Sequence, residues 1–129
     1  MEPSSNIKIL IVDDFIGMRK ILRDLLTTLG YANIHEADDG KTALPRLQAE
    51  PFDFLITDLN MPGMPGLELV QTLRADEALN HLPVLMVTSE ARRPQILSAA
   101  SAGVDGYLVK PFTAESLQRK IQAIYGGHR

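Results

Sequence analysis

The sequence has no cysteine among its 129 residues. This absence excludes disulfide bridges, thiolate metal sites and cysteine nucleophiles. It also contains no run of about 18 apolar residues, the length that a membrane-spanning helix needs. The first residues lack the basic stretch and apolar segment that are typical of a secretory signal. We therefore expect a cytoplasmic protein.

Positive charge is also scarce, since 13 lysines and arginines face 16 acidic residues and the net charge is −3. A nucleic-acid-binding surface requires a basic excess, so we expect no nucleic-acid partner. Hydrophobic residues make up 45% and charged residues 22%, which is typical of a soluble globular protein. The sequence shows no repeat or linker. We expect an N-terminal tail over residues 1–6, one domain over residues 7–126 and no output domain.

Short apolar runs alternate with longer amphipathic stretches along the chain. Runs of this kind are typical of strands that are buried on both faces of a parallel sheet. The candidate strands are Ile7–Val12, Asn33–Ala37 (the weakest), Phe52–Ile56, Val84–Val87 and Tyr107–Val109.

Apolar residues spaced three and four apart predict helices between these strands. The stripes are Phe15, Met18, Leu22, Leu25, Leu26 and Leu29; Leu67, Val70 and Leu73; Ile96, Ala99 and Ala100; and Leu117, Ile121, Ile124 and Tyr125. Pro94 favours the first turn of the third of these helices, and Gly103 favours its end. The alternation predicts an α/β fold, a doubly wound parallel sheet with helices on both faces.

Pro45 conflicts with a helix expected over roughly Lys41–Ala49. Proline beyond the first turn of a helix removes a backbone hydrogen bond and costs about 3 kcal/mol. We expect this helix either to begin late, near Leu44, or to be kinked.

Polar side chains follow four of the predicted strands. They are Asp13 and Asp14, then Asp58, then Thr88, and finally Lys110. Ligands of parallel α/β sheets bind at the carboxyl ends of the strands, so these groups are expected to converge. Clustered carboxylates repel one another, and Mg²⁺ relieves that repulsion. A cation, a nucleophilic carboxylate, an ammonium and a hydroxyl together suit phosphoryl transfer to an aspartate.

Each of these residues also has a purely structural interpretation. Asp13 and Asp14 are suited to capping a helix, Asp58 to a turn, and Lys110 to simple solvation. Chance rarely places two acids, a third acid, a hydroxyl and a lysine after four separate strands. The joint pattern therefore favours a phosphoryl-transfer site over the separate structural roles.

The same residues resemble the receiver domain of two-component response regulators over essentially the whole chain. The matching motifs are Ile9–Asp14, Ile56–Gly63, Thr88 and Lys110–Phe112. The resemblance implies a flavodoxin-like, five-stranded parallel sheet with strand order 2-1-3-4-5.

The resemblance also implies the roles of the central residues. Asp58 is the phosphoacceptor. Asp13, Asp14, Asp58 and the backbone carbonyl of Asn60 hold Mg²⁺. Lys110 contacts the phosphoryl group, and the peptide bond that follows it, before a proline, is usually cis in this family.

Further residues are implied to carry the signal. Thr88 moves toward the phosphoryl group and Tyr107 turns inward with it. Asn60 and Glu90 are candidates for tuning dephosphorylation, and Tyr107 and Lys120 for contacting a partner. Plain packing of Tyr107 and simple solvation of Lys120 are the alternatives.

Within this family the chain is most similar to the chemotaxis regulators. That similarity implies a histidine kinase of the CheA type, a flagellar motor switch protein as target, a possible auxiliary phosphatase and a monomeric state. It implies a signalling protein whose only catalysis is its own phosphorylation and dephosphorylation. Leu59, Arg92–Pro94 and Ala123 depart from the usual pattern, the last two on the partner face.

Three other functions remain open. A receiver can serve as a phosphorelay intermediate or act on a target other than the motor. A Mg²⁺-dependent phosphatase with an aspartate nucleophile is a second alternative, although such enzymes place two acids as Asp-x-Asp, and Asp58 is followed by Leu59 and Asn60. A flavin-binding module is the third, and Asp13 and Asp14 would repel its phosphate.

Overall fold

The computed structural model describes residues 6–127, so most of the expected tail over residues 1–6 lies outside the described residues. In chain order the elements are β1 (Lys8–Val12), α1 (Ile16–Thr28), β2 (Asn33–Ala37), α2 (Gly40–Ala49), β3 (Phe54–Thr57), α3 (Gly66–Arg74), β4 (Val84–Thr88), α4 (Arg93–Ala102), β5 (Gly106–Val109) and α5 (Ala114–Gly127). None of these helices is both long enough and apolar enough to span a bilayer.

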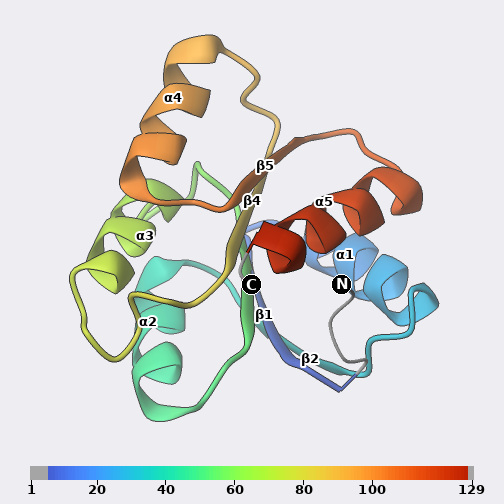
Figure 1. Cartoon of the computed structure of the whole chain (residues 1–129), viewed down its shortest axis with the longest axis horizontal. Helices are drawn as coiled ribbons and strands as arrows, with labels where there is room; N and C mark the ends of the chain where they lie inside the picture. The colour runs from blue at the N-terminus through green and yellow to red at the C-terminus, as the bar shows by residue number, and fades with distance from the viewer. Residues whose placement is uncertain (1–5, 128–129) are drawn as a thin grey trace.

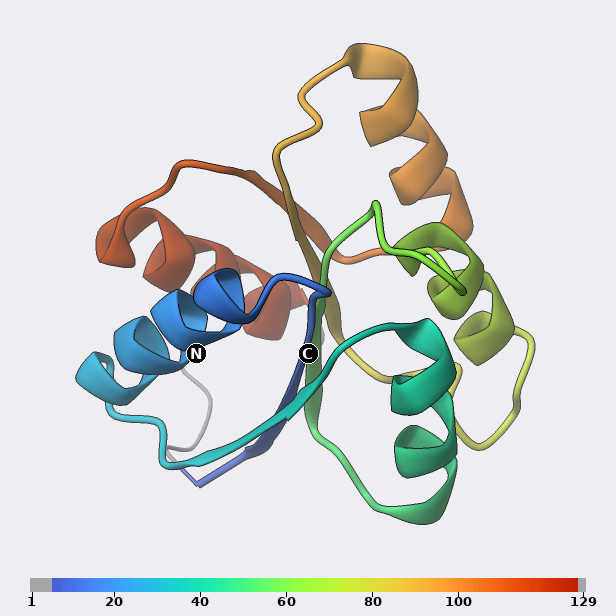
Figure 2. The ribbon, with the colours of Figure 1, turned by 180° about the vertical axis from the view of Figure 1, so that it is seen from behind.

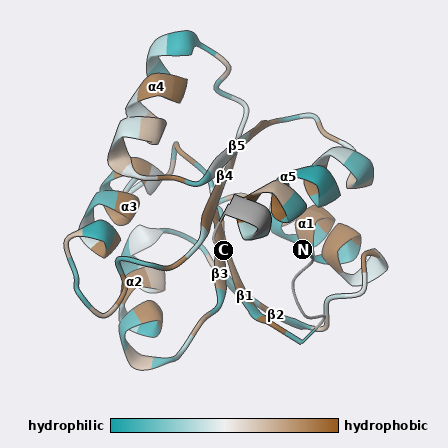
Figure 3. Ribbon diagram, viewed as in Figure 1, coloured by the Kyte–Doolittle hydropathy of each residue, from teal (hydrophilic) through white to brown (hydrophobic). Residues whose placement is uncertain are grey.

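The strands form one parallel sheet in the order β2-β1-β3-β4-β5, which confirms the expected topology. Helices α1 and α5 cover one face, and α2, α3 and α4 cover the other (Figure 1). The strands are coloured mainly hydrophobic and the helices are mixed (Figure 3). This is the pattern of a sheet buried on both sides.

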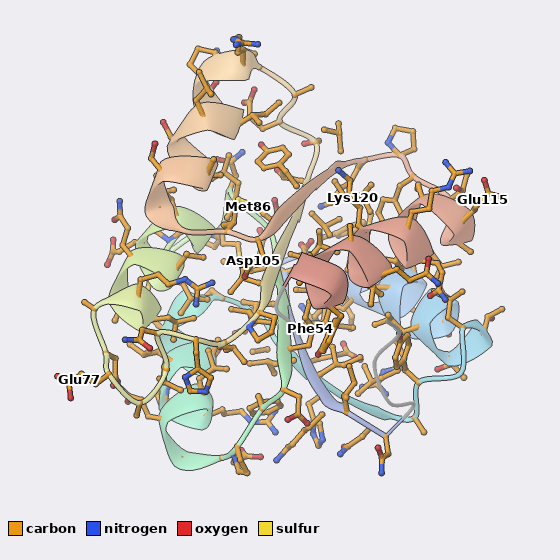
Figure 4. The ribbon with its side chains drawn as sticks, viewed as in Figure 1. Phe54, Glu77, Met86, Asp105, Glu115 and Lys120 are labelled. Atoms are coloured by element: carbon orange, nitrogen blue, oxygen red, sulfur yellow. The ribbon has the colours of Figure 1, made fainter. Side chains whose placement is uncertain are left out.

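Alternate residues of the central strands enter two separate cores, because successive side chains of a strand point to opposite faces. Phe54 belongs to the core beneath α1 and α5, and Met86 to the core beneath α2, α3 and α4. Figure 4 shows these two side chains on opposite sides of the sheet. Both are fully buried, as are the neighbouring residues of β1, β3 and β4.

Helix α1 differs from the expected stripe at its beginning. Leu22 and Leu26 are buried as predicted, but Phe15 is 62% exposed. Phe15 occupies the N-cap position and has an extended backbone, so its side chain lies outside the helical periodicity that would direct it to the core.

Helix α2 begins at Gly40 and continues through Pro45, so the late start near Leu44 is wrong. Asp39 caps the helix by accepting hydrogen bonds from the amides of Lys41 and Thr42, and the Thr42 hydroxyl completes a capping box. This cap fixes the start of the helix. The carbonyl that Pro45 leaves without an amide donor belongs to the exposed residue Lys41, where water can take the donor's place.

Helix α4 begins and ends at the residues that the sequence predicts. Pro94 lies in its first turn, and Gly103 ends it in the left-handed conformation with φ 105°. Only one of its residues, Ala99, is buried. The helix therefore rests on the rest of the protein through a small contact surface.

Candidate functional site

The carboxyl ends of β1 and β3 lie side by side at one edge of the sheet, where each strand turns into the next helix (Figure 2). The parallel ladder continues just beyond these ends. The Asp13 amide donates to the Ala37 carbonyl at 3.2 Å, and the Asp58 amide donates to the Val12 carbonyl at 2.9 Å. These bonds fix the backbone from which both acidic side chains project.

Three carboxylates meet at this edge. Asp13, Asp14 and Asp58 each offer an oxygen within 4.8 Å of the others. Asp13 is 1% and Asp58 8% exposed, whereas Asp14 is exposed. The ammonium of Lys110 lies 3.1 Å from Oδ2 of Asp13 and 3.2 Å from Oδ2 of Asp58. A single cation from the end of β5 therefore bridges the two buried carboxylates.

Backbone amides orient the other oxygen of each buried carboxylate. Oδ1 of Asp13 accepts the Phe15 amide at 2.9 Å. Oδ1 of Asp58 accepts the Leu59 amide at 2.6 Å and the Asn60 amide at 3.4 Å. Both Oδ2 atoms consequently face Lys110. The Lys110–Pro111 peptide bond is cis, as the family resemblance implied.

The start of α3 packs directly on the backbone of Asp58. The Gly66 amide donates to the Leu59 carbonyl at 3.0 Å. A Cβ atom added to Gly66 would lie 1.8 Å from the Asp58 carbonyl oxygen. Only glycine fits this contact. The sequence indicated a helix after Pro65–Gly66 but gave no sign that Gly66 touches the site.

A second supporting group is Arg19, whose guanidinium donates to the Asp13 carbonyl at 2.6 Å and to Glu36 at 3.0 Å. Arg23 donates to the other oxygen of Glu36 at 2.7 Å. Burial raises the pKa of Glu36, but the hydrogen bonds from the two arginines outweigh it and hold that pKa below its usual value. Glu36 stays charged and anchors Arg19 against the turn after β1.

The predicted switch residues meet at the loop after β4. Thr88 is buried, and its hydroxyl accepts the Glu90 amide at 3.3 Å. Tyr107 is half-buried and donates its hydroxyl to the Glu90 carbonyl at 2.7 Å. Burial raises the pKa of Tyr107, so the hydroxyl remains a donor at neutral pH. Glu90 thus joins the two residues through its backbone.

The remaining candidates lie at the rim of the site or beyond it. Asn60 is exposed in the turn after β3. Lys120 is half-buried on α5, and Figure 4 places it between α5 and the segment that follows β5.

Burial is the largest influence on Asp13 and raises its pKa above 3.8, although the Phe15 amide and Lys110 oppose this effect. Ionised Asp13 therefore costs folding free energy in the metal-free protein. We expect Asp13→Asn to raise the free energy of unfolding at neutral pH by on the order of 1 kcal/mol, because functional sites commonly hold such strain. Urea denaturation in the presence of a chelator measures it.

The pH dependence gives the control. The penalty of ionised Asp13 is absent below pH 3.8 and complete once the pH exceeds the raised pKa of the folded state. The advantage of the asparagine variant should therefore shrink as the pH falls. A variant that is less stable at neutral pH, or whose advantage grows in acid, would contradict this account.

Comparison with known proteins places this geometry in a family. The response regulator receiver domain profile matches residues 9–122. The chemotaxis protein CheY of Pseudomonas aeruginosa is 63% identical over 118 residues, which cover 92% of this chain and 95% of that protein. CheY-3 of Vibrio cholerae is 59% identical over 122 residues, which cover 95% of this chain and 94% of that protein.

Solved structures of receiver domains have the same fold as this chain. CheY4 of Vibrio cholerae superposes with a TM-score of 0.85 at 36% identity, over 92% of this chain and 98% of that one. The receiver domain of the sensor histidine kinase PA1611 of Pseudomonas aeruginosa, with a magnesium ion coordinated in its active site cleft, superposes with a TM-score of 0.84 at 27% identity, over 94% and 98%. The cluster of Asp13, Asp14 and Asp58, the strand order and these matches together show that the chain belongs to the response regulator receiver domain family.

Proposed function

We propose that this protein is a chemotaxis response regulator whose Asp58 accepts a phosphoryl group from a histidine kinase in a Mg²⁺-dependent reaction. The observation that carries the proposal is the Lys110 ammonium between Asp13 and Asp58, at 3.1 and 3.2 Å, beside a third carboxylate. Phosphoryl transfer needs such an arrangement of positioned acceptor and positive charge, because it depends mainly on alignment and charge neutralisation.

The donor set of the site fits Mg²⁺, which prefers oxygen ligands and few carboxylates. Asp13, Asp14 and Asp58 would hold the ion together with the backbone carbonyl of Asn60. When bound, the ion neutralises negative charge that accumulates on the phosphoryl oxygens. The magnesium ion in the related PA1611 receiver domain supports this assignment.

The orientation of Asp58 suggests which of its oxygens reacts. Oδ1 is occupied by the Leu59 and Asn60 amides, and Oδ2 lies beside Lys110. Oδ2 forms the new P–O bond while the P–N bond of the donor phosphohistidine breaks and its electron pair returns to the imidazole. Lys110 then pairs with a phosphoryl oxygen. Water later hydrolyses the acyl phosphate, and Asn60 and Glu90 tune its access.

The phosphoryl group changes the protein by shifting a population. It offers an acceptor for the Thr88 hydroxyl proton, and movement toward that acceptor would carry the hydroxyl oxygen away from the Glu90 amide that now donates to it. Movement of Thr88 favours the inward position of Tyr107, and the surface that includes Tyr107 and Lys120 then binds the target.

The chemotaxis relatives support a proposal for the location, oligomeric state and partners of this protein. We propose a cytoplasmic, monomeric signalling protein whose receiver domain spans residues 7–126 and whose catalysis is limited to its own phosphate. Its partners are a kinase of the CheA type and the flagellar motor switch, with an auxiliary phosphatase as a further candidate. The 63% and 59% identities to chemotaxis proteins favour the motor over another phosphorelay target.

Binding of the N-terminal peptide of a flagellar motor switch protein tests the target. We expect affinity to rise about tenfold or more when beryllium fluoride is added with Mg²⁺, which corresponds to a conformational coupling of 1–3 kcal/mol. Fluorescence anisotropy of a labelled peptide measures it. The Asp58→Asn variant, which cannot hold the fluoride complex, should show no increase.

The other outcomes are equally informative. An increase that persists in Asp58→Asn would remove Asp58 from the mechanism. If the peptide affinity is the same with and without beryllium fluoride, the motor is not the target and a phosphorelay or non-motor role replaces it.

A further inference from the structure

The loop between β4 and α4 contains an ion pair that neither the sequence pattern nor the family assignment explains. The Arg92 guanidinium donates to both carboxylate oxygens of Glu90, from Nε to Oε1 at 2.8 Å and from Nη2 to Oε2 at 3.1 Å. The backbone amide of Arg92 also donates to Oε1 at 3.1 Å. Three donors from a single residue therefore hold a carboxylate that lies two positions earlier in the chain.

The backbone of Glu90 touches both switch residues. Its amide donates to the Thr88 hydroxyl and its carbonyl accepts the Tyr107 hydroxyl. We call inward the half-buried position of Tyr107 in which its hydroxyl donates to the Glu90 carbonyl. The position of the Glu90 peptide groups therefore determines whether Tyr107 finds its acceptor in this position. Any group that fixes Glu90 acts on both switch residues together.

The Glu90–Arg92 ion pair is suited to shifting an equilibrium between two conformations without fixing either of them. The Arg92 side chain is 72% exposed, whereas the Glu90 side chain is 17% exposed. An exposed ion pair makes a small contribution to stability and weakens as salt is added. That energy can change the ratio of two conformations several-fold but cannot trap either one. The hydrogen bonds from Arg92 also lower the pKa of Glu90, so the pair stays charged at neutral pH.

We propose that Arg92 is a positioning residue that holds Glu90 so that its carbonyl accepts the Tyr107 hydroxyl, and thereby raises the inward population of Tyr107 before any phosphorylation. Arginine suits this role better than lysine because its planar fork reaches both carboxylate oxygens together, whereas lysine offers a single point charge. The consequence for target binding rests on the proposed function. The effect on Tyr107 does not.

The test is a double-mutant cycle monitored at Tyr107 in the unphosphorylated protein. Fluorine NMR of 3-fluorotyrosine-labelled protein reports the environment of each tyrosine, and Tyr107→Phe assigns the signal. We expect Arg92→Ala to lower the inward-to-outward ratio by about twofold to fivefold, the factor that corresponds to an exposed ion pair. Arg92→Lys should restore part of the ratio.

Two comparisons separate positioning from a general loss of structure. Glu90→Ala should produce a similar shift, and the double variant should be no worse than either single variant, because both remove the same interaction. High salt should move the wild-type signal toward that of Arg92→Ala and leave the variant unchanged. The matched control is Arg93→Ala, which removes a neighbouring exposed arginine and should leave the signal in place.

Additive effects of Arg92→Ala and Glu90→Ala would overturn the proposal, as would a shift of equal size in Arg93→Ala. Because no phosphoryl chemistry is involved, the cycle gives its answer even if Asp58 accepts no phosphoryl group. Failure of this inference is therefore distinguishable from failure of the proposed function.

Discussion

Gly66→Ala should lower the free energy of unfolding by about 3 kcal/mol, the upper end of the usual cost of overpacking. The added methyl group would lie 1.8 Å from the Asp58 carbonyl oxygen and 2.9 Å from its carbonyl carbon. Neither atom can rotate away, since both belong to the backbone. The start of α3 must therefore move outward, or the peptide group after Asp58 must turn. Urea denaturation monitored by circular dichroism measures the loss.

The same substitution should also impair the site. The peptide group after Asp58 carries the Leu59 amide, which holds Oδ1 of Asp58 at 2.6 Å. A displacement of about 1 Å in a reacting group can reduce a rate on the order of 100-fold, so phosphoryl uptake should fall by about that factor.

Gly17→Ala is the matched control, because the atoms nearest to its added methyl group would belong to the ring of Phe15, which is 62% exposed and can swing aside. Gly17 lies in the first turn of α1, where alanine favours the helix by up to about 1 kcal/mol. If Gly66→Ala unfolds at the same urea concentration as Gly17→Ala and takes up phosphoryl groups at the wild-type rate, the close contact of Gly66 with Asp58 affects neither stability nor phosphoryl uptake.

The sheet order and helix positions were accessible from the sequence because local patterns encode them. β1, β3 and β4 are nearly continuous apolar runs, and only a sheet covered on both faces buries such runs. Pro94 and Gly103 marked the two ends of α4, since each residue has a conformational preference that acts without tertiary contacts.

Two local predictions failed for reasons that lie outside simple periodicity. Phe15 has the spacing of a core residue but occupies an N-cap, so it is exposed. Pro45 left two possibilities for α2, a late start or a kink, and the late start is wrong because the Asp39 and Thr42 capping box starts the helix at Gly40. In both cases the geometry of a helix terminus overrides the pattern of side chains.

The parts of the site that the sequence left hidden all depend on tertiary proximity. Gly66 and Arg19 are ordinary residue types for a helix start and a helix surface. Their contacts appear only when the Asp58 carbonyl and the Asp13 carbonyl lie beside them. One sequence carries no signal for contacts of this kind.

Replacing Asp58 with asparagine should abolish phosphoryl uptake while leaving the protein folded. The asparagine amide oxygen can still accept the Leu59 and Asn60 amides at the place of Oδ1, but the nitrogen that replaces Oδ2 is no nucleophile for phosphorus. The matched control is Asp53→Asn. Asp53 is an exposed aspartate before β3, at the opposite end of that strand, where its carboxylate accepts the Lys8 amide at 2.8 Å.

The most direct test of the account is the intact mass of the protein after incubation with a small phosphodonor such as acetyl phosphate, with Mg²⁺ or with a chelator. We predict that the wild type and Asp53→Asn each gain one phosphoryl group only when Mg²⁺ is present, that peptide mapping places it on Asp58, and that Asp58→Asn gains none. Uptake by Asp58→Asn at the wild-type level, or uptake that is unchanged by the chelator, would contradict the account.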